Sequence, residues 1–256
     1  MARDEELEIL RVHSAHDPAA MSGRWRAVAK RVGLSMDAFA SAGEHELFVL
    51  RSASPAGGAR RVYLSSGVHG DEPGAALGLL EWAEANAAAL RDFDLLIFPL
   101  MNPWGLQNNI RHDERGRDLN RLFHSRANPF PAWRRELGRE RFDLAICLHE
   151  DFDAHGCYIY ELGVAGIAER LLAAGSPFVP PDPRDEIETS VAKGGVIRHG
   201  DLKREDFPLK GLPETVWLYF ERCPCSLTIE TPSELSLYDR VRAHGAMLSE
   251  ALFGAL

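Results

Sequence analysis

Short, continuous apolar runs limit most strongly what this chain can fold into. Residues 93–100 read FDLLIFPL, and residues 142–150 read FDLAICLHE. An unbroken apolar run of this length is typical of a strand with both faces buried. We therefore predict that both segments lie inside a sheet. CSLTIETP (225–232) is predicted as a further strand that ends at a proline.

Predicted helices alternate with these strands. Pro73 suits the first turn of a helix, and the segment 75–90 that follows is rich in strong helix formers. A final amphipathic helix is predicted at 235–256. This alternation predicts an α/β fold with a mixed, mostly parallel sheet. No repeat or linker divides the 256 residues, so we expect a single domain, with a short helical segment at about residues 1–40.

The composition argues against several classes of function. The net charge at pH 7 is −9, which disfavours a general role on nucleic acids or membrane surfaces. The N-terminal MARDEELEIL does not resemble a secretory signal, and no stretch approaches the about 20 apolar residues of a membrane helix. We therefore expect a cytoplasmic protein. The four cysteines are too few and too irregular for a disulfide framework, and we interpret them as buried thiols.

Metal-type and acidic residues follow three of the predicted strands. The strand at 60–67 runs into GVHGDEP, which contains His69 and Glu72; the strand at 142–150 ends at His149; and the late strand ends at Glu230. Ligands of open α/β sheets bind beyond the carboxyl ends of strands. These side chains are therefore predicted to form one site at one edge of the sheet.

Two histidines and a carboxylate are a common ligand set for catalytic zinc. Bound zinc lowers the pKa of water to about 7, and a separate carboxylate must then move the proton. Glu230 is the free candidate for that step. The spacing of His69 and Glu72 is weak evidence alone, since such pairs arise by chance and a histidine at a strand end is more often structural.

A long polar segment, 102–123, carries four arginines: Arg111, Arg115, Arg117 and Arg121. A loop of this length inside a compact domain is usually functional or disordered. Guanidinium groups are suited to binding a carboxylate or a developing oxyanion. The alternative is a solvated charged loop, which we favour for Arg115 and Arg117.

Taken together, the motifs resemble the zinc metallocarboxypeptidase superfamily. GVHGDEP, NPWG, an arginine separated by six residues from DLNR, a strand ending in LH and a late strand ending in TIETP occur in the order seen in that superfamily. They are also similar to its succinylglutamate desuccinylase and aspartoacylase branch. The matched segments span residues 60 to 232.

The resemblance implies a catalytic metal site. It assigns one Zn²⁺ per chain to His69, Glu72 and His149 as ligands. It makes Asp118 the carboxylate that orients His69 through its other ring nitrogen, a common requirement of zinc histidines. Glu230 matches the general base and acid.

The resemblance also implies a substrate with a free carboxylate. Asn120 and Arg121, in DLNR, match the pair that holds this carboxylate. Arg111 matches the arginine that polarises the scissile carbonyl and stabilises the oxyanion. The implied fold is a mixed sheet of about eight strands sandwiched by helices. The implied partners are a small peptide or an N-acyl amino acid, without nucleic acid or membrane; the oligomeric state stays open.

The chain departs from the digestive-type enzymes of the superfamily. Those enzymes carry a tyrosine a little over twenty residues before the catalytic glutamate, where this chain reads DFPLKG near residue 208. Tyr219 lies closer to Glu230, but its hydrophobic surroundings favour a core role. The chain is also short for a digestive-type enzyme and begins without a secretory signal. We expect from both facts a small bacterial-type peptidase or a member of the deacylase branch.

We expect a zinc-dependent hydrolase that cleaves an amide bond next to a free carboxylate. The long loop from NPWG to DLNR favours a carboxypeptidase that removes a C-terminal residue. The alternative is an N-acyl amino acid deacylase. A non-catalytic zinc-binding domain is the rival of another class, and it would be marked by a missing ligand or a missing glutamate.

The sequence leaves the role of several other polar residues open. Asp151, Asp153, His155 and Glu161 either line the pocket and select a basic group, or form a solvated turn. His112, His124, His199 and His244 show no ligand spacing, and we interpret them as surface or structural residues. Residues 175–215 hold many prolines, glycines and charges, and no elements are assigned there.

Overall fold

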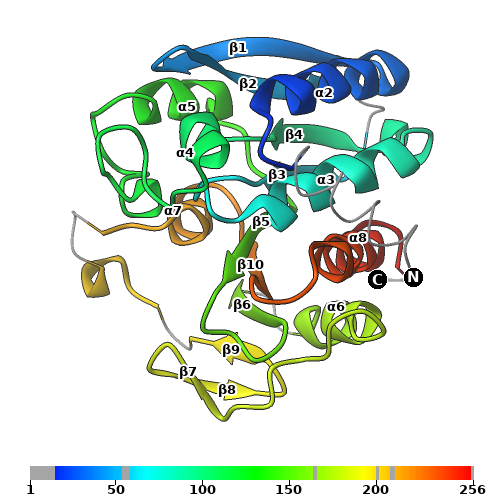
Figure 1. Cartoon of the computed structure of the whole chain (residues 1–256), viewed down its shortest axis with the longest axis vertical. Helices are drawn as coiled ribbons and strands as arrows, with labels where there is room; N and C mark the ends of the chain where they lie inside the picture. Colours follow the sequence, from blue (N-terminus) through cyan, green and yellow to red (C-terminus); the bar gives the residue numbers. More distant parts are fainter. Residues whose placement is uncertain (1–14, 54–57, 164–165, 200–201, 208–210, 255–256) are drawn as a thin grey trace.

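The computed structural model describes residues 15–53, 58–163, 166–199, 202–207 and 211–254. One ten-stranded sheet runs through them in the order β1-β2-β4-β3-β5-β10-β6-β9-β8-β7 (Figure 1). The strands are β1 (Leu34–Ala42), β2 (His45–Ser52), β3 (Arg61–Ser65), β4 (Asp94–Phe98), β5 (Leu144–Asp151), β6 (Tyr158–Gly163), β7 (Glu186–Ile187), β8 (Ser190–Lys193), β9 (Val196–Arg198) and β10 (Cys225–Pro232).

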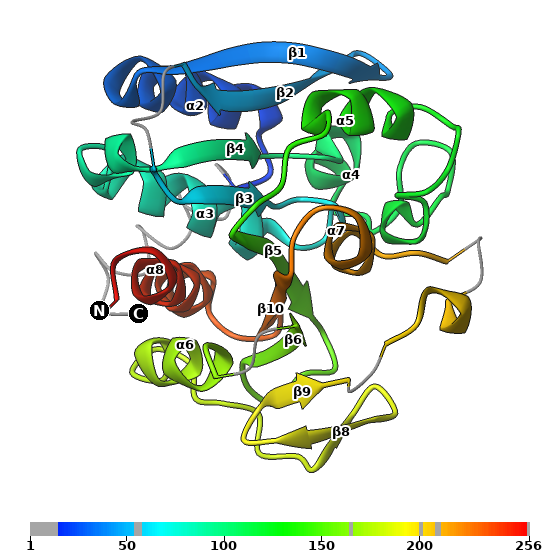
Figure 2. The ribbon, with the colours of Figure 1, turned by 180° about the vertical axis from the view of Figure 1, so that it is seen from behind.

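The helices form layers on both faces of this sheet. They are α2 (Pro18–Val32), α3 (Pro73–Ala85), η1 (Ala89–Asp92), α4 (Pro103–Asn108), η2 (Leu119–Arg121), α5 (Phe130–Leu137), α6 (Ala168–Gly175), η3 (Arg204–Asp206), α7 (Glu214–Glu221) and α8 (Leu237–Phe253). Helices α2, α3, α8 and α6 lie along one face, and α5 and α7 lie on the other, as the two opposite views show (Figures 1 and 2).

The strands divide their side chains between two hydrophobic cores. On β5, Ile146 and Leu148 belong to the core that includes α3 and α8, whereas Ala145 and Cys147 belong to the core that includes α5 and α7. Both faces are therefore buried, which explains why β5 reads as a continuous apolar run. Successive side chains of a strand point to opposite faces, so the same alternation decides where the polar residues at the strand end point.

The register of β10 against β5 places two of the polar residues side by side. The strands are parallel, with Glu230 opposite His149 and Thr231 opposite Glu150. Ile229 and Leu227 lie in the α3 and α8 core, so Glu230 points to the other face, as does His149. Tyr158 on β6 pairs with Glu230 from the other side, and it also lies on this face, because its neighbour Ile159 lies in the α3 and α8 core.

The α/β class and the helix-covered mixed sheet are confirmed, with differences in detail. The sheet has ten strands rather than about eight. The neighbouring pairs β4–β3, β3–β5, β5–β10 and β6–β9 are parallel. The other neighbouring pairs are antiparallel. The single domain stays a prediction.

Two segments differ from the sequence-based prediction. The helical segment expected to about residue 40 ends at Val32, because Gly33 adopts a left-handed φ of 88° there, and β1 follows; residues 1–14 lie outside the described part of the chain. The unassigned region 175–215 contains the hairpin of β7 and β8 and the strand β9. Among the described residues, no helix has the length and apolarity that a membrane span requires.

Helix α8 buries a histidine against α3. His244 is fully buried, and a Cβ on Gly78 of α3 would lie 2.9 Å from the His244 Cβ, so the two helices meet closely at this point. The His244 Nε2 atom lies 3.0 Å from Thr231 Oγ1. Burial lowers the pKa of His244, and the nearby positive charge of Arg240 lowers it further, to about 3.

This buried histidine predicts a pH dependence of stability. In the unfolded chain histidine has a pKa of about 6.5, so below that pH the unfolded state binds a proton that the folded state does not. The contribution of the neutral His244 to the free energy of unfolding is complete above pH 6.5. It falls by about 1.4 kcal/mol per pH unit as the pH is lowered from 6.5 to 3. Urea unfolding at several pH values checks this. The variant His244→Gln should have a shallower pH slope over that range; equal slopes would contradict the assignment.

Candidate active site

His69 and Glu72 lie in the turn that connects β3 to α3. Close backbone packing fixes this turn: a Cβ on Gly70 would lie 2.0 Å from the Gly105 carbonyl carbon and 2.4 Å from the Ile110 carbonyl oxygen. Glu72 immediately precedes the first residue of α3. The turn therefore presents both side chains at the carboxyl end of β3, next to the end of β5.

The side chains of His69, Glu72 and His149 converge at this edge. The Glu72 carboxylate lies 2.5 Å from Nδ1 of His69 through one oxygen and 2.8 Å from Nδ1 of His149 through the other. All three side chains are buried, and one ligand atom from each lies within 4.8 Å of the others. Two imidazole nitrogens and a carboxylate at this separation are a donor set suited to a divalent cation such as zinc.

Charge interactions within this cluster outweigh the effect of burial. Burial lowers the pKa of His69, but the Glu72 carboxylate and the hydrogen bond to Asp118 raise it to about 9. Burial raises the pKa of Glu72, and the two imidazoles outweigh that effect and lower it. Because metal ligands must be deprotonated, binding of a cation here is coupled to release of protons.

Asp118 contacts the other side of the His69 ring. Its Oδ1 atom lies 3.1 Å from His69 Nε2 and also accepts the backbone N–H of Asn120. Donation of the Nε2 proton to Asp118 leaves Nδ1 directed at Glu72. Asp118 thus contacts the ring nitrogen to which the family resemblance assigns it, and its role in orienting a metal ligand stays a prediction.

Arg111 borders the cluster on the side of the long loop. Its Nη1 atom lies 3.6 Å from a Glu72 oxygen and its Nη2 atom 3.3 Å from Asp118 Oδ2. The guanidinium is only partly exposed, and these carboxylates raise its pKa against the effect of burial. A fixed positive charge thus lies beside the three convergent side chains.

Asn120 is oriented by a buried part of α7. Its Oδ1 atom accepts the backbone N–H of Glu214 at 3.0 Å, which leaves the amide NH₂ as a donor on the cavity wall. The Glu214 side chain accepts hydrogen bonds from Ser65 Oγ at 2.9 Å and from the Tyr63 hydroxyl. Burial raises the pKa of Glu214. These contacts fix the start of α7, and with it the side chain of Asn120.

The other arginines of the loop separate into different roles. Arg121 lines the cavity and forms no ion pair with the described residues; its Nη1 atom donates to the Asn120 carbonyl at 3.1 Å. Arg115 is exposed, as expected for a solvated side chain. Arg117 instead donates to Asp113 at 2.7 Å and so closes the loop on itself, which corrects the solvated interpretation for that residue.

Glu230 reaches the same cavity from the end of β10. Its Oε2 atom is buried and has no hydrogen-bond partner within the described part of the chain. Burial raises the pKa of Glu230; the positive charge of His149 opposes this shift, and the negative charge of Glu72 adds to it. A buried acceptor without a partner beside a cation-binding cluster is suited to bind water and take its proton.

Glu150 borders the cavity, and its carboxylate ties the site to two helices. Its carboxylate accepts the backbone N–H of Gly74 at 2.7 Å, the Thr231 hydroxyl at 3.1 Å and Arg240 Nη1 at 2.7 Å. A Cβ on Gly74 would lie 2.3 Å from a Glu150 oxygen. This contact explains the glycine that follows GVHGDEP. It also fixes the start of α3 directly beside Glu72.

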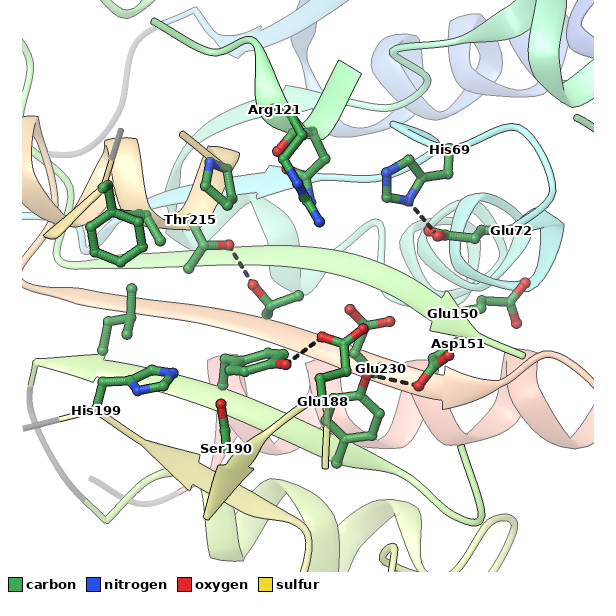
Figure 3. A pocket seen from close by; sticks show the side chains of 18 of the residues that line it. His69, Glu72, Arg121, Glu150, Asp151, Glu188, Ser190, His199, Thr215 and Glu230 are labelled. Carbon is green, nitrogen blue, oxygen red and sulfur yellow. Dashed lines mark hydrogen bonds and ion pairs between the residues drawn. The ribbon is translucent and has the colours of Figure 1, made fainter. Parts of the chain in front are cut away.

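A cavity of about 250 Å³ extends from the cluster along β6 and the β7–β8 hairpin. Figure 3 shows its side chains, among them several that the sequence did not single out. These are Tyr158, Tyr160, Glu188, Ser190, Thr215 and Thr228, and they are joined by His199. The alternation along β6 is the signal that could have placed Tyr158 and Tyr160. His199 had been interpreted as a surface or structural residue.

The polar residues that follow His149 lie in different places relative to the cavity. Asp151 lines the cavity, whereas Asp153 and His155 are exposed. Glu161 is buried on the opposite face and accepts the backbone N–H groups of Ile167 and Ala168 at the start of α6. Only Asp151 of these residues therefore takes part in the cavity.

Part of the sequence matches the model of a known protein family. Residues 58–153 match the succinylglutamate desuccinylase/aspartoacylase catalytic domain. This segment includes His69, Glu72, Arg111 and His149 but ends before Glu230. No curated protein has a significantly similar sequence.

Solved structures with the same fold are metallopeptidase-like. A predicted metallopeptidase from Shewanella baltica is 22% identical, with a TM-score of 0.80 over 93% of this chain and 92% of that one. A metallo-carboxypeptidase from Burkholderia cenocepacia is 18% identical, with a TM-score of 0.68 over 93% and 68%. A metallo-carboxypeptidase from Pseudomonas aeruginosa, in complex with (2-guanidinoethylmercapto)succinic acid, is 18% identical, with a TM-score of 0.59 over 89% and 67%.

The expected resemblance to the zinc metallocarboxypeptidase superfamily and its desuccinylase and aspartoacylase branch is therefore confirmed. The fold is that of the carboxypeptidase-like hydrolases. The individual roles of the site residues stay predictions.

The contact between Asp118 and His69 predicts an effect on metal affinity. Partners that orient a metal-binding histidine typically contribute 10–100-fold to affinity, so Asp118→Asn should weaken zinc binding by about this factor. Competition against a chromogenic chelator measures the change. Asp92→Asn, which alters an exposed carboxylate in η1, is the matched control. Equal affinities of the two variants would show that Asp118 does not orient the ligand.

Proposed function

We propose that this protein is a zinc-dependent hydrolase that cleaves an amide bond next to a free carboxylate. The favoured reaction is removal of a C-terminal residue from a peptide. His69, Glu72 and His149 would hold one Zn²⁺. Asn120 and Arg121 would bind the substrate carboxylate.

One observation carries this proposal. The cluster of two histidines and a glutamate opens into a cavity that also receives Glu230 and the positive charges of Arg111 and Arg121. The buried Oε2 atom of Glu230 has no hydrogen-bond partner among the described residues. A hydrolase of amides needs an electrophilic centre, a proton acceptor and a site for the developing negative charge. The cavity brings groups suited to each need together.

The residues divide the chemistry between them. A bound Zn²⁺ supplies Lewis-acid polarisation of the carbonyl and lowers the pKa of water. Glu230 takes a proton from the attacking water and delivers it to the nitrogen of the leaving amine as the C–N bond breaks. Arg111 stabilises the negative charge that develops on the carbonyl oxygen.

Two observations support a substrate that carries a free carboxylate. The described loop places Asn120 and Arg121 on the wall that Arg111 also occupies, as binding of a terminal carboxylate next to the scissile bond requires. In addition, the Pseudomonas aeruginosa metallo-carboxypeptidase of similar fold binds a succinic acid derivative, so a carboxylate-bearing ligand fits this type of cavity.

A deacylase of N-acyl amino acids is the second candidate. The observation in its favour is the match of residues 58–153 to the succinylglutamate desuccinylase/aspartoacylase catalytic domain. The same groups would serve this reaction, because its substrates also carry a free carboxylate next to an amide. A non-catalytic metal-binding domain is the remaining candidate, although Glu230 and the cluster are all present.

Hydrolysis of a substrate panel separates the candidates. The panel holds C-terminal dipeptides, diamino-acid peptides and N-acyl amino acids, tested with zinc-loaded protein. Release of a C-terminal residue would establish a carboxypeptidase, and cleavage of N-acyl amino acids alone would establish a deacylase. Glu230→Gln should retain zinc and abolish the activity. Inactivity on the whole panel, with zinc bound, would support the non-catalytic domain.

The position of Arg111 predicts a large effect on turnover. Loss of one group that stabilises the oxyanion typically costs about 10²–10³ in kcat, and Arg111→Ala should show a loss of this size. Arg115→Ala, in the exposed part of the same loop, is the matched control and should keep the wild-type rate. A kcat for Arg111→Ala within about threefold of wild type would remove this residue from the proposed role.

A further inference from the structure

We propose that the cavity selects substrates that carry an ammonium or guanidinium group in addition to the free carboxylate, and that Glu188 determines this selection. The inference rests on the proposed function, since it names the class of substrate that the same site accepts. It would place the positive group of the substrate against the wall formed by β6 and the β7–β8 hairpin.

The cavity has walls of opposite charge. Arg111 and Arg121 come from the long loop on one side, and Asp151 and Glu188 come from the end of β5 and from the β7–β8 hairpin on the other. Figure 3 shows the carboxylates of Asp151, Glu188 and Glu230 gathered opposite Arg121. A ligand with a negative group at one end and a positive group at the other complements both walls.

Tyrosine hydroxyls hold the two acidic side chains without neutralising them. The Tyr160 hydroxyl donates to Glu188 at 2.6 Å, and the Tyr158 hydroxyl donates to Asp151 at 3.0 Å. Both tyrosines are on β6, on the cavity face. A neutral donor fixes the direction of a carboxylate but leaves its charge in place.

No cation of the described chain pairs with Asp151 or Glu188. Arg184, the arginine that precedes the hairpin, donates instead to the buried Asp182 through Nε at 2.9 Å and Nη2 at 2.6 Å. Arg198 on β9 pairs with Glu161 and Glu169, away from the cavity. The negative charge of this wall is therefore available to a ligand.

The backbone of the hairpin turn sets the position of Glu188. Glu188 and Thr189 have positive φ values of 46° and 64°, in the left-handed region that favours glycine and asparagine. Two-residue hairpins of this kind usually contain Asn-Gly. Strained residues of this kind cluster at ligand-binding sites. Here the turn directs a carboxylate into the cavity.

The charge pattern also discriminates against particular ligands. A substrate with several carboxylates, such as an N-succinyl dicarboxylic amino acid, would bring negative charge against the acidic wall, which is unfavourable when both groups lose water. A substrate with one carboxylate and an apolar side chain would leave this wall unpaired. A terminal lysine, ornithine, arginine or other diamino acid satisfies both walls.

Paired substrates that differ only in the ammonium group test the proposal. Zinc-loaded wild type, Glu188→Gln and Glu186→Gln are assayed on N-benzoylglycyl-lysine and N-benzoylglycyl-norleucine, and on Nα-acetyl-lysine and Nα-acetyl-norleucine for the deacylase reaction. Glu186 is an exposed carboxylate of β7 that does not line the cavity, so its variant is the matched control. Calorimetric binding of free lysine and free norleucine gives a readout without turnover.

We expect wild type to prefer the lysine compounds in kcat/KM and in binding. Glu188→Gln should reduce this preference by about three- to tenfold, because a charge pair that the ligand partly covers contributes about that much to binding. The reduction should come from weaker binding of the lysine compounds, while binding of the norleucine compounds stays unchanged. Glu186→Gln should match wild type.

The outcomes separate this proposal from the proposed function. Hydrolysis without a preference for lysine, or an unchanged preference in Glu188→Gln, overturns the selection and leaves the hydrolase standing. Absence of all hydrolysis together with Glu188-dependent binding of lysine overturns the hydrolase and supports the subsite. Equal or absent binding of the two amino acids overturns the subsite.

Discussion

The register between β5 and β10 is the constraint on which the rest of the site depends. Because side chains alternate between the faces of a strand, His149 and Glu230 point to the α5 and α7 side, where Glu230 lines the cavity, while their neighbours Glu150 and Thr231 point to the α3 and α8 side. A shift of either strand by one residue would exchange these pairs. The apolar residues that precede them prevent such a shift, since each belongs to a core that a slip would disrupt.

On the α3 and α8 face, the ends of β5 and β10 support the cluster of His69, Glu72 and His149. A buried carboxylate such as Glu150 is costly unless its hydrogen bonds are satisfied. Arg240, Thr231 and the start of α3 satisfy them. Glu72 is thereby held against His149 through the backbone of α3, and the site depends on a helix near the end of the described chain as well as on its own loop.

The sequence predicted the residues whose positions follow from local patterns. Apolar runs followed by histidine or glutamate located the strand ends, and the motif order located the loop residues. The sequence did not reveal β1, because LSMDAFASA has no continuous apolar run. Nine residues of mixed burial at a sheet edge resemble a loop when only the sequence is known. It also missed Glu188 and His199, since their approach to the cavity depends on pairing of β9 with β6, which no local pattern specifies.

The position of the β7–β8 hairpin has a consequence for how such proteins diverge. The convergent histidines and glutamate come from the centre of the sheet, whereas Glu188 comes from its end, beyond β9. Substitutions in the hairpin leave the central cores untouched, so selection can alter it without loss of stability in the centre. Exchange of this one short peripheral turn can therefore change which ligands the cavity accepts, while the cluster of histidines and glutamate at the centre of the sheet stays the same.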